Sequence, residues 1–224
     1  LTALCLTVLP YSGSSQSYPA NGLVAYYPFD GNANDASGNA NNGVAANVTT
    51  GTNRFGATGS ACQFDGSSSS VTIPSLASTN LSAMTLSAWV KPMSVPPVQA
   101  SIINKWATFT GPLGDYALLL LGDLRPHFGN GRQSSSLVIT STNALSVGQW
   151  YHVVVTLDAA GTATMLVDGV VKAKGYVSPL LPPATEPVRI GYMVTAGGSR
   201  VDTFDGSIDD VRIYNRALSD VEVQ

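Results

Sequence analysis

Two acidic segments of this sequence carry residue types that could bind a cation. In the first, the loop at residues 30–35, Asp30, Asn32 and Asp35 place side-chain oxygens around a glycine-containing turn. Calcium takes six to eight oxygen ligands, which Asp and Asn side chains can supply. The loop lacks the glycine and the glutamate that an EF-hand requires at its sixth and twelfth positions. The alternative is a turn whose Asp and Asn side chains hydrogen-bond to their own backbone.

The second segment is the run at residues 208–214, where Asp209 alternates in phase with Val211 and Ile213. Because successive side chains of a strand point to opposite faces, this parity places Asp209 on the core side or at its margin and Asp210 on the other side. A buried carboxylate needs hydrogen bonds, an opposite charge or a metal ion. Asp209 is therefore expected to be either a metal ligand or a hydrogen-bonded anchor for a neighbouring loop.

The glutamates, aspartates and histidines show no spacing typical of a catalytic site. Glu186 and Glu222, the only glutamates, are far apart in the chain, and the adjacent aspartates of the 208–214 run point to opposite faces by parity. His127 and His152 have no evident serine elbow or cysteine partner, and His152 lies within a predicted strand. We therefore expect that the chain is not an enzyme.

Composition narrows the class of protein further. Of the 224 residues, 44% are hydrophobic and 11% charged, with 22 glycines and 13 prolines, a balance that suits many short strands joined by turns. A formal net charge of -3 excludes the basic surface that nucleic acids or anionic membranes require. Twelve of the fourteen acidic residues are aspartates, which favour turns over strands.

The elements that position these residues are predicted from alternating hydrophobicity. Short alternating runs recur between turn residues, and no interior segment shows a sustained helical period. The dipeptide Asp168-Gly169 is the strongest hairpin signal, and Ser219 with Glu222 three residues later predicts a short helix over 219–224. The sequence thus predicts an all-β fold, an antiparallel two-sheet β-sandwich or jelly roll with a short C-terminal helical turn. The predicted strands are residues 23–29, 70–73, 85–90, 101–105, 116–121, 136–140, 150–157, 163–167, 170–174, 188–192 and 207–214.

The first twenty residues differ from the remainder of the chain. Residues 1–10 are almost wholly apolar and residues 12–17 polar, which is typical of a signal-peptide remnant, although an N-terminal extension with an extra edge strand is the alternative. We expect an exported domain over residues 21–224, secreted or at the cell surface and not inserted in a membrane. Cys62 shares strand parity with Phe64, so it is either a core thiol or the partner of Cys5 in a disulfide.

Five segments, in order, carry a family resemblance. The chain resembles a laminin-G-like jelly-roll domain of the concanavalin A-like lectin/glucanase superfamily over about residues 21–224. Two departures are Cys62, where leucine is usual, and Asn42, where histidine is common. The segments are GLVAYYPFD at 22–30, DASGNANNG at 35–43, LSAWVKP at 86–92, QWYHVVVT at 149–156 and FDGSIDDVRIYNRALS at 204–219.

The resemblance implies a structural calcium ion between the opening loop and the final strand. The matching positions are Asp30, Asn32, Asp35 and Asp209. Superfamily glucanases use a Glu-x-Asp-x-x-Glu strand, which Glu186 and Glu222 cannot form at their spacing.

The resemblance also implies a recognition or adhesion module whose partner is a glycan or a surface protein. Sugar sites combine an aromatic platform with charged and amide side chains. Trp106, Arg125 and His127 are the candidate ligand-binding residues, whereas Trp89 and Trp150 are expected in the core. Two alternatives stay open. One is a structural or protein–protein interaction domain of a surface protein, and the other is an accessory domain of a larger secreted glycan-active enzyme.

Overall fold

The structure is a computed structural model that describes residues 18–74, 76, 81, 83–105, 116–130, 138–177, 186–195 and 197–223. Residues 1–17, with Cys5, and the candidate ligand residue Trp106 lie outside this range. The elements are β1 (Leu23–Tyr27), β2 (Val44–Ala46), β3 (Thr49–Thr52), β4 (Thr58–Asp65), β5 (Ser70–Ile73), β6 (Met84–Pro92), β7 (Gln99–Asn104), β8 (Tyr116–Leu121), β9 (Pro126–Asn130), β10 (Val138–Thr140), β11 (Tyr151–Leu157), β12 (Thr162–Val167), β13 (Val170–Tyr176), β14 (Val188–Ile190), β15 (Met193–Val194), β16 (Arg200–Val201), β17 (Asp205–Tyr214) and α1 (Asp220–Val223).

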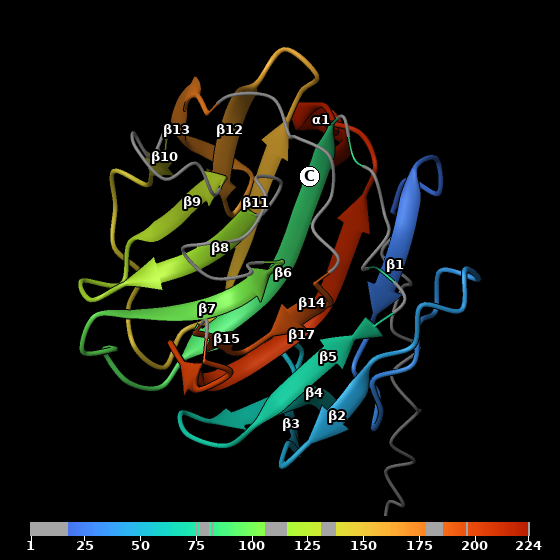
Figure 1. Ribbon diagram of the computed structural model, residues 1–224, viewed down its shortest axis with the longest axis vertical. Helices are drawn as coiled ribbons and strands as arrows, with labels where there is room; N and C mark the ends of the chain where they lie inside the picture. Colours follow the sequence, from blue (N-terminus) through green and yellow to red (C-terminus); the bar gives the residue numbers. More distant parts are fainter. Residues whose placement is uncertain are drawn as a thin grey trace, which may run out of the picture.

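Two large antiparallel sheets pack face to face (Figure 1). The eight-stranded sheet has the order β13-β12-β11-β6-β17-β4-β3, with β1 paired to β17. The seven-stranded sheet has the order β10-β9-β8-β7-β14-β5-β2, and β15 and β16 form a small separate hairpin. The predicted all-β sandwich with a short C-terminal helical turn is therefore confirmed.

One contiguous core fills the space between the sheets. On β6, Leu86, Ala88 and Val90 are fully buried and face this core, as the alternating pattern requires. Cys62 and Phe64 on β4 join the same cluster, and Cys62 is a free buried thiol whose pKa burial raises to about 12. The prediction of a core position for Cys62 is confirmed.

Strand β17 is the central element of the eight-stranded sheet. It pairs with β6 on one side, while β4 pairs with its first half and β1 with its second half on the other. Its register shifts between Asp209 and Arg212, and Asp210 adopts a positive φ of 49°. This β-bulge changes which side chains of the strand face the core.

Two local features predicted from the sequence, the Asp168-Gly169 turn and the start of the C-terminal helix, are present in the structure. Asp168 and Gly169, both at positive φ, join β12 to β13, and Ser219 caps α1 with its amide donating to Glu222 at 3.0 Å. The strands β2, β3, β15 and β16 were not predicted, because β2 and β3 are short and mostly exposed and β15 and β16 have only two residues each. Strand β9 was also not predicted, and of β4 the sequence indicated only the strand parity of Cys62 and Phe64. In the described residues, no helix has the length and apolar character that crossing a membrane demands.

Gly206 generates a prediction about the start of β17. Its φ is +142°, and a Cβ atom there would lie 2.1 Å from the carbonyl oxygen of Lys91. We expect Gly206→Ala to lower the free energy of unfolding by about 2–4 kcal/mol in urea titrations, because backbone must move. Gly198→Ala is the matched control, since Gly198 also has positive φ but open space around it, and should cost about 1 kcal/mol. Equal losses for the two variants would refute this account.

Candidate functional site

The loop after β1 folds around the carboxylate of Asp35. That carboxylate accepts hydrogen bonds from the amides of Tyr26, Ser37 and Asn41, each at 2.9 Å, and from the Ser37 hydroxyl at 2.8 Å. Burial alone would raise the pKa of Asp35, but these hydrogen bonds outweigh it and lower the pKa. Asp35 is thus an ionised anchor that ties the loop to β1.

Asn32 closes a tighter turn in the same loop. Its side-chain oxygen accepts from the amide of Asn34 at 2.8 Å, and its amide group donates to the Asp30 carbonyl at 3.2 Å. Asp30 itself is exposed. This geometry is the backbone-bonded turn that the sequence left open as the alternative to a metal loop.

The bulge in β17 overturns the predicted parity of Asp209. Ile208 and Val211 both face the core, whereas Asp209 is paired in register with Trp89 on the outer side of the eight-stranded sheet. The expectation that Asp209 and Asp210 point to opposite faces is wrong, because the positive φ of Asp210 interrupts the alternation and both carboxylates meet one guanidinium. Trp89 is correspondingly on the outer face and half-buried, not in the core, and Trp150 is half-buried outside the core cluster.

The shared guanidinium belongs to Arg54 in the turn between β3 and β4. Asn53 shapes this turn, with its side-chain oxygen accepting from the amides of Phe55 and Ala57 at 3.0 Å. The Arg54 guanidinium lies 3.3 Å from Asp209 and 2.6 Å from Asp210, and its side chain is only 8% exposed. Burial and the neighbouring charge of Asp210 raise the pKa of Asp209 to about 7, and the charge of Arg54 opposes that rise.

Calcium does not find a ready-made ligand set here. In the described part of the chain, no three His, Cys, Asp or Glu side chains are grouped so that they could hold a metal ion. The structure brings Asp30 near enough to Asp209 for its charge to raise the pKa of Asp209, but the oxygens of Asn32, Asp35 and Asp209 already accept hydrogen bonds. The cation that the structure does place against Asp209 is Arg54.

Aromatic rings extend this charge cluster across the outer face. The Arg54 guanidinium lies 4.3 Å from the ring centroid of Phe55 and 4.4 Å from that of Trp89, which stacks on His152 at 5.0 Å. The imidazole Nε2 of His152 lies 2.8 Å from the Ser87 hydroxyl. Burial, followed by the charges of Arg212 and Arg54, lowers the pKa of His152 to about 4, so the ring is neutral at pH 7.

Sequence reasoning missed the pairing of Ser87 with His152. The two side chains meet because β6 and β11 are adjacent strands. The sequence alone does not indicate which strands pair or in which register. In the described residues, no carboxylate is hydrogen-bonded to the imidazole, so the pair lacks the third member of a Ser-His-Asp triad. The cavity it lines has a volume of about 40 Å³, close to the space of one water molecule.

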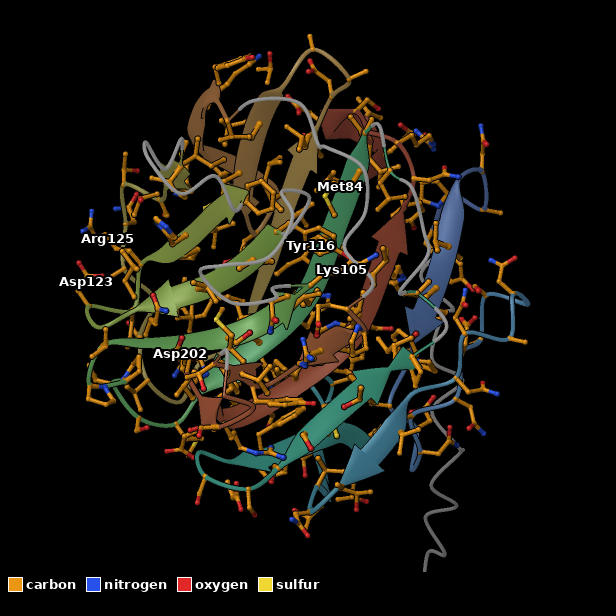
Figure 2. All side chains as sticks on the ribbon, in the orientation of Figure 1. Met84, Lys105, Tyr116, Asp123, Arg125 and Asp202 are labelled. Atoms are coloured by element: carbon orange, nitrogen blue, oxygen red, sulfur yellow. The ribbon has the colours of Figure 1, made fainter. Side chains whose placement is uncertain are left out.

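The predicted ligand-binding residues Arg125 and His127 lie close together at the start of β9. Arg125 immediately precedes the strand, and its charge acts on His127. His127 is on the outer face of the seven-stranded sheet, because Phe128, the next residue of β9, faces the core. The His127 Nδ1 atom lies 2.9 Å from the Thr140 hydroxyl on β10, and burial lowers its pKa, with the charge of Arg125 adding to the effect. Arg125 pairs with Asp123 at 2.6 Å at the margin of the sheet (Figure 2).

Comparison with known proteins defines the class. A family model described as the Concanavalin A-like lectin/glucanases superfamily matches residues 64–224. The chain therefore belongs to this superfamily. No match was found among curated protein sequences.

Solved structures share the fold at low sequence identity. The chain is 21% identical to domain 4 of AbnA, an extracellular arabinanase from Geobacillus stearothermophilus solved with arabinotriose, with a TM-score of 0.65 over 90% of this chain and 96% of that domain. It is 17% identical to the binding domain of Paraclostridial Mosquitocidal Protein 1, with a TM-score of 0.70 over 91% of this chain and 51% of that one. A Trypanosoma rangeli sialidase is 22% identical, with a TM-score of 0.67 over 92% of this chain and 33% of the sialidase.

The Arg54 cluster generates a stability prediction. We expect Arg54→Met to lower the free energy of unfolding by about 3–5 kcal/mol, because it leaves the buried carboxylate of Asp209 without its cation and the adjacent Asp210 with Arg212 alone. Arg125→Met is the control, since it removes an exposed pair with Asp123 and should cost about 0–1 kcal/mol. Urea unfolding of both variants measures the difference, and similar losses would show that Arg54 contributes no more than a surface ion pair.

Proposed function

We propose that this chain is a non-catalytic carbohydrate-binding module of an extracellular protein. The observation that carries the proposal is its likeness, over nearly the full length of that domain, to an arabinanase domain solved with arabinotriose. The two glutamates support a role without catalysis, because Glu186 pairs with Arg189 at 2.7 Å and Glu222 with Arg216 at 2.6 Å. The apolar residues 1–10 support export.

The binding surface of the proposal includes Trp106, Arg125 and His127. Arg125, just before β9, and His127, on β9, present a cation and a neutral imidazole close together, and both groups can donate hydrogen bonds to sugar hydroxyls. Trp106 supplies the aromatic platform on which the apolar face of a sugar ring packs. Of the three residues, Trp106 is the one whose replacement by alanine should weaken glycan binding most.

A second candidate function is recognition of a protein or cell-surface receptor. Similar structures include the receptor binding domain of botulinum neurotoxin D and the mosquitocidal binding domain, both named for binding. The chain spans about half of each of these proteins. Such a role, or that of an accessory domain in a larger enzyme, uses the same non-catalytic scaffold.

Glycan binding by the purified chain tests the proposal. On a glycan array, we expect the wild type to bind at least one glycan, and Trp106→Ala and His127→Ala to weaken that binding at least about tenfold. Trp150→Ala is the tryptophan control and should leave binding unchanged in the folded fraction. A folded wild type that binds no glycan but captures a defined surface protein would contradict the proposal and favour the second candidate.

Calcium binding stays a prediction, which we carry forward as part of the proposal. Its ligands would be Asp30, Asn32, Asp35 and Asp209, and binding would have to replace hydrogen bonds that their oxygens now accept. Calcium at a hundredfold excess over its dissociation constant should then stabilise the fold by about 2.7 kcal/mol. Thermal melting with calcium and with a chelator measures this for the wild type and Asp209→Asn. An unchanged midpoint, with no calcium found by elemental analysis, would show that the ion is not bound.

A further inference from the structure

A cavity of about 240 Å³ lies at one end of the sandwich, where four connections meet. The β4–β5 turn contributes Asp65, the β6–β7 connection Pro96 and Pro97, and the β8–β9 turn Leu124. Phe204, from the connection before β17, and Asp205, the first residue of β17, also line the cavity. The volume is several times that of one water molecule and just below the range of about 300–1,000 Å³ typical of drug-sized ligands, which suits a single sugar ring.

Hydrogen bonds between the connections fix the shape of this cavity. The Gly66 amide donates to the Phe204 carbonyl at 3.0 Å, and the Thr203 hydroxyl donates to the Gly66 carbonyl at 2.5 Å. The Met93 amide donates to the Asp205 carbonyl at 2.9 Å, which ties the β6–β7 connection to β17. The wall is thus preformed, and a ligand need not order it.

The two carboxylates of the cavity, Asp65 and Asp205, differ in their hydrogen bonding. Asp65 and Asp205 are directly opposite each other in the β4–β17 register. Asp65 accepts from the Ser68 hydroxyl at 2.7 Å and from the amides of residues 67–69, which hold its pKa well below the usual range. Within the described residues, the Asp205 carboxylate makes no hydrogen bond or ion pair, although it is half-buried. Asp205 therefore presents free acceptor oxygens beside a fixed negative charge.

We propose that this cavity binds one neutral monosaccharide unit of a glycan, with Asp205 accepting hydrogen bonds from its hydroxyl groups. The proposal rests on the carbohydrate-binding function above and adds a site and a substrate class to it. The C–H face of the sugar packs on the aliphatic surfaces of Pro97 and Leu124, both at the wall of the cavity. An acidic sugar is disfavoured, because its carboxylate would approach two aspartates.

The test is an NMR titration of the ¹⁵N-labelled full chain with matched neutral and acidic sugars. The neutral probes are D-glucose, D-galactose and L-arabinose, and the acidic probes are D-glucuronic and D-galacturonic acid. We expect at least one neutral sugar to shift the amide signals of Gly66, Phe204 and Asp205, and its uronic acid to bind at least about tenfold more weakly.

Three variants test whether the sugar binds in the cavity or elsewhere on the surface. Asp205→Asn should weaken binding of the neutral sugar at least about tenfold, because a charged acceptor is lost. It should also reduce the ratio between the affinities for the neutral sugar and for its uronic acid. Asp220→Asn, which removes a charge from the exposed start of α1, should change neither value. Ser94→Trp, at an exposed wall position, fills the cavity and should abolish the shifts even if Asp205→Asn fails to fold.

The outcomes distinguish this site from the proposed function. Sugar-induced shifts confined to Arg125, His127 and their neighbours would keep the carbohydrate-binding function and overturn the cavity. Shifts at the cavity that are as strong with the uronic acids would overturn the neutral-sugar assignment. An absence of shifts with every sugar would overturn the cavity, and an empty glycan array in addition would overturn the proposed function itself.

Discussion

The pairing of the Arg54 guanidinium with the carboxylates of Asp209 and Asp210 is the interaction on which the centre of the eight-stranded sheet depends. Removing an ion from water costs several kcal/mol, and a buried charge is tolerated only when a partner repays that cost. Here one guanidinium from the β3–β4 turn meets two adjacent carboxylates of β17. Their attraction therefore fastens the edge hairpin of the sheet to its central strand.

The same network continues across the outer face of the sheet. Asp210 also accepts from the Tyr26 hydroxyl at 2.5 Å and pairs with Arg212 at 3.0 Å. The Arg212 guanidinium in turn lies over the rings of Tyr18 and Tyr26, at 4.8 Å and 4.4 Å. Most of these polar groups bond to one another, and a cavity of about 40 Å³ lies beside them. The binding sites proposed above lie elsewhere, on the seven-stranded sheet and at the end of the sandwich.

How far the sequence predicts this molecule follows from what each signal encodes. Alternating hydrophobicity predicted the fold, because a half-buried strand must alternate, but it did not predict β9, the strand that carries His127. The same reasoning failed for Asp209. Asp210 adopts a positive φ and forms a bulge that reverses the parity of the strand. Aspartate can adopt this conformation, but its presence in the sequence does not predict a bulge.

Contacts between distant segments escaped the sequence for a different reason. Arg54 is a single arginine in a turn, with no periodic pattern around it, and its partners lie 155 and 156 positions further along the chain. Ser87 meets His152 only because of the register of β6 and β11. Such pairs depend on topology, and one sequence without its fold does not specify which strands become neighbours.

Strand β17 connects the buried charge cluster to the end of the sandwich. Asp205 begins the strand at the wall of the larger cavity, and Asp209 lies four residues further on, against Arg54. Between them Gly206 passes so close to the Lys91 carbonyl that no side chain fits. A strand held by close backbone contact at one point and by ion pairs at another has little freedom to move. The position of Asp205 is therefore set by the same constraints that stabilise the sheet, and a binding site built on it is rigid because its supporting strand is rigid.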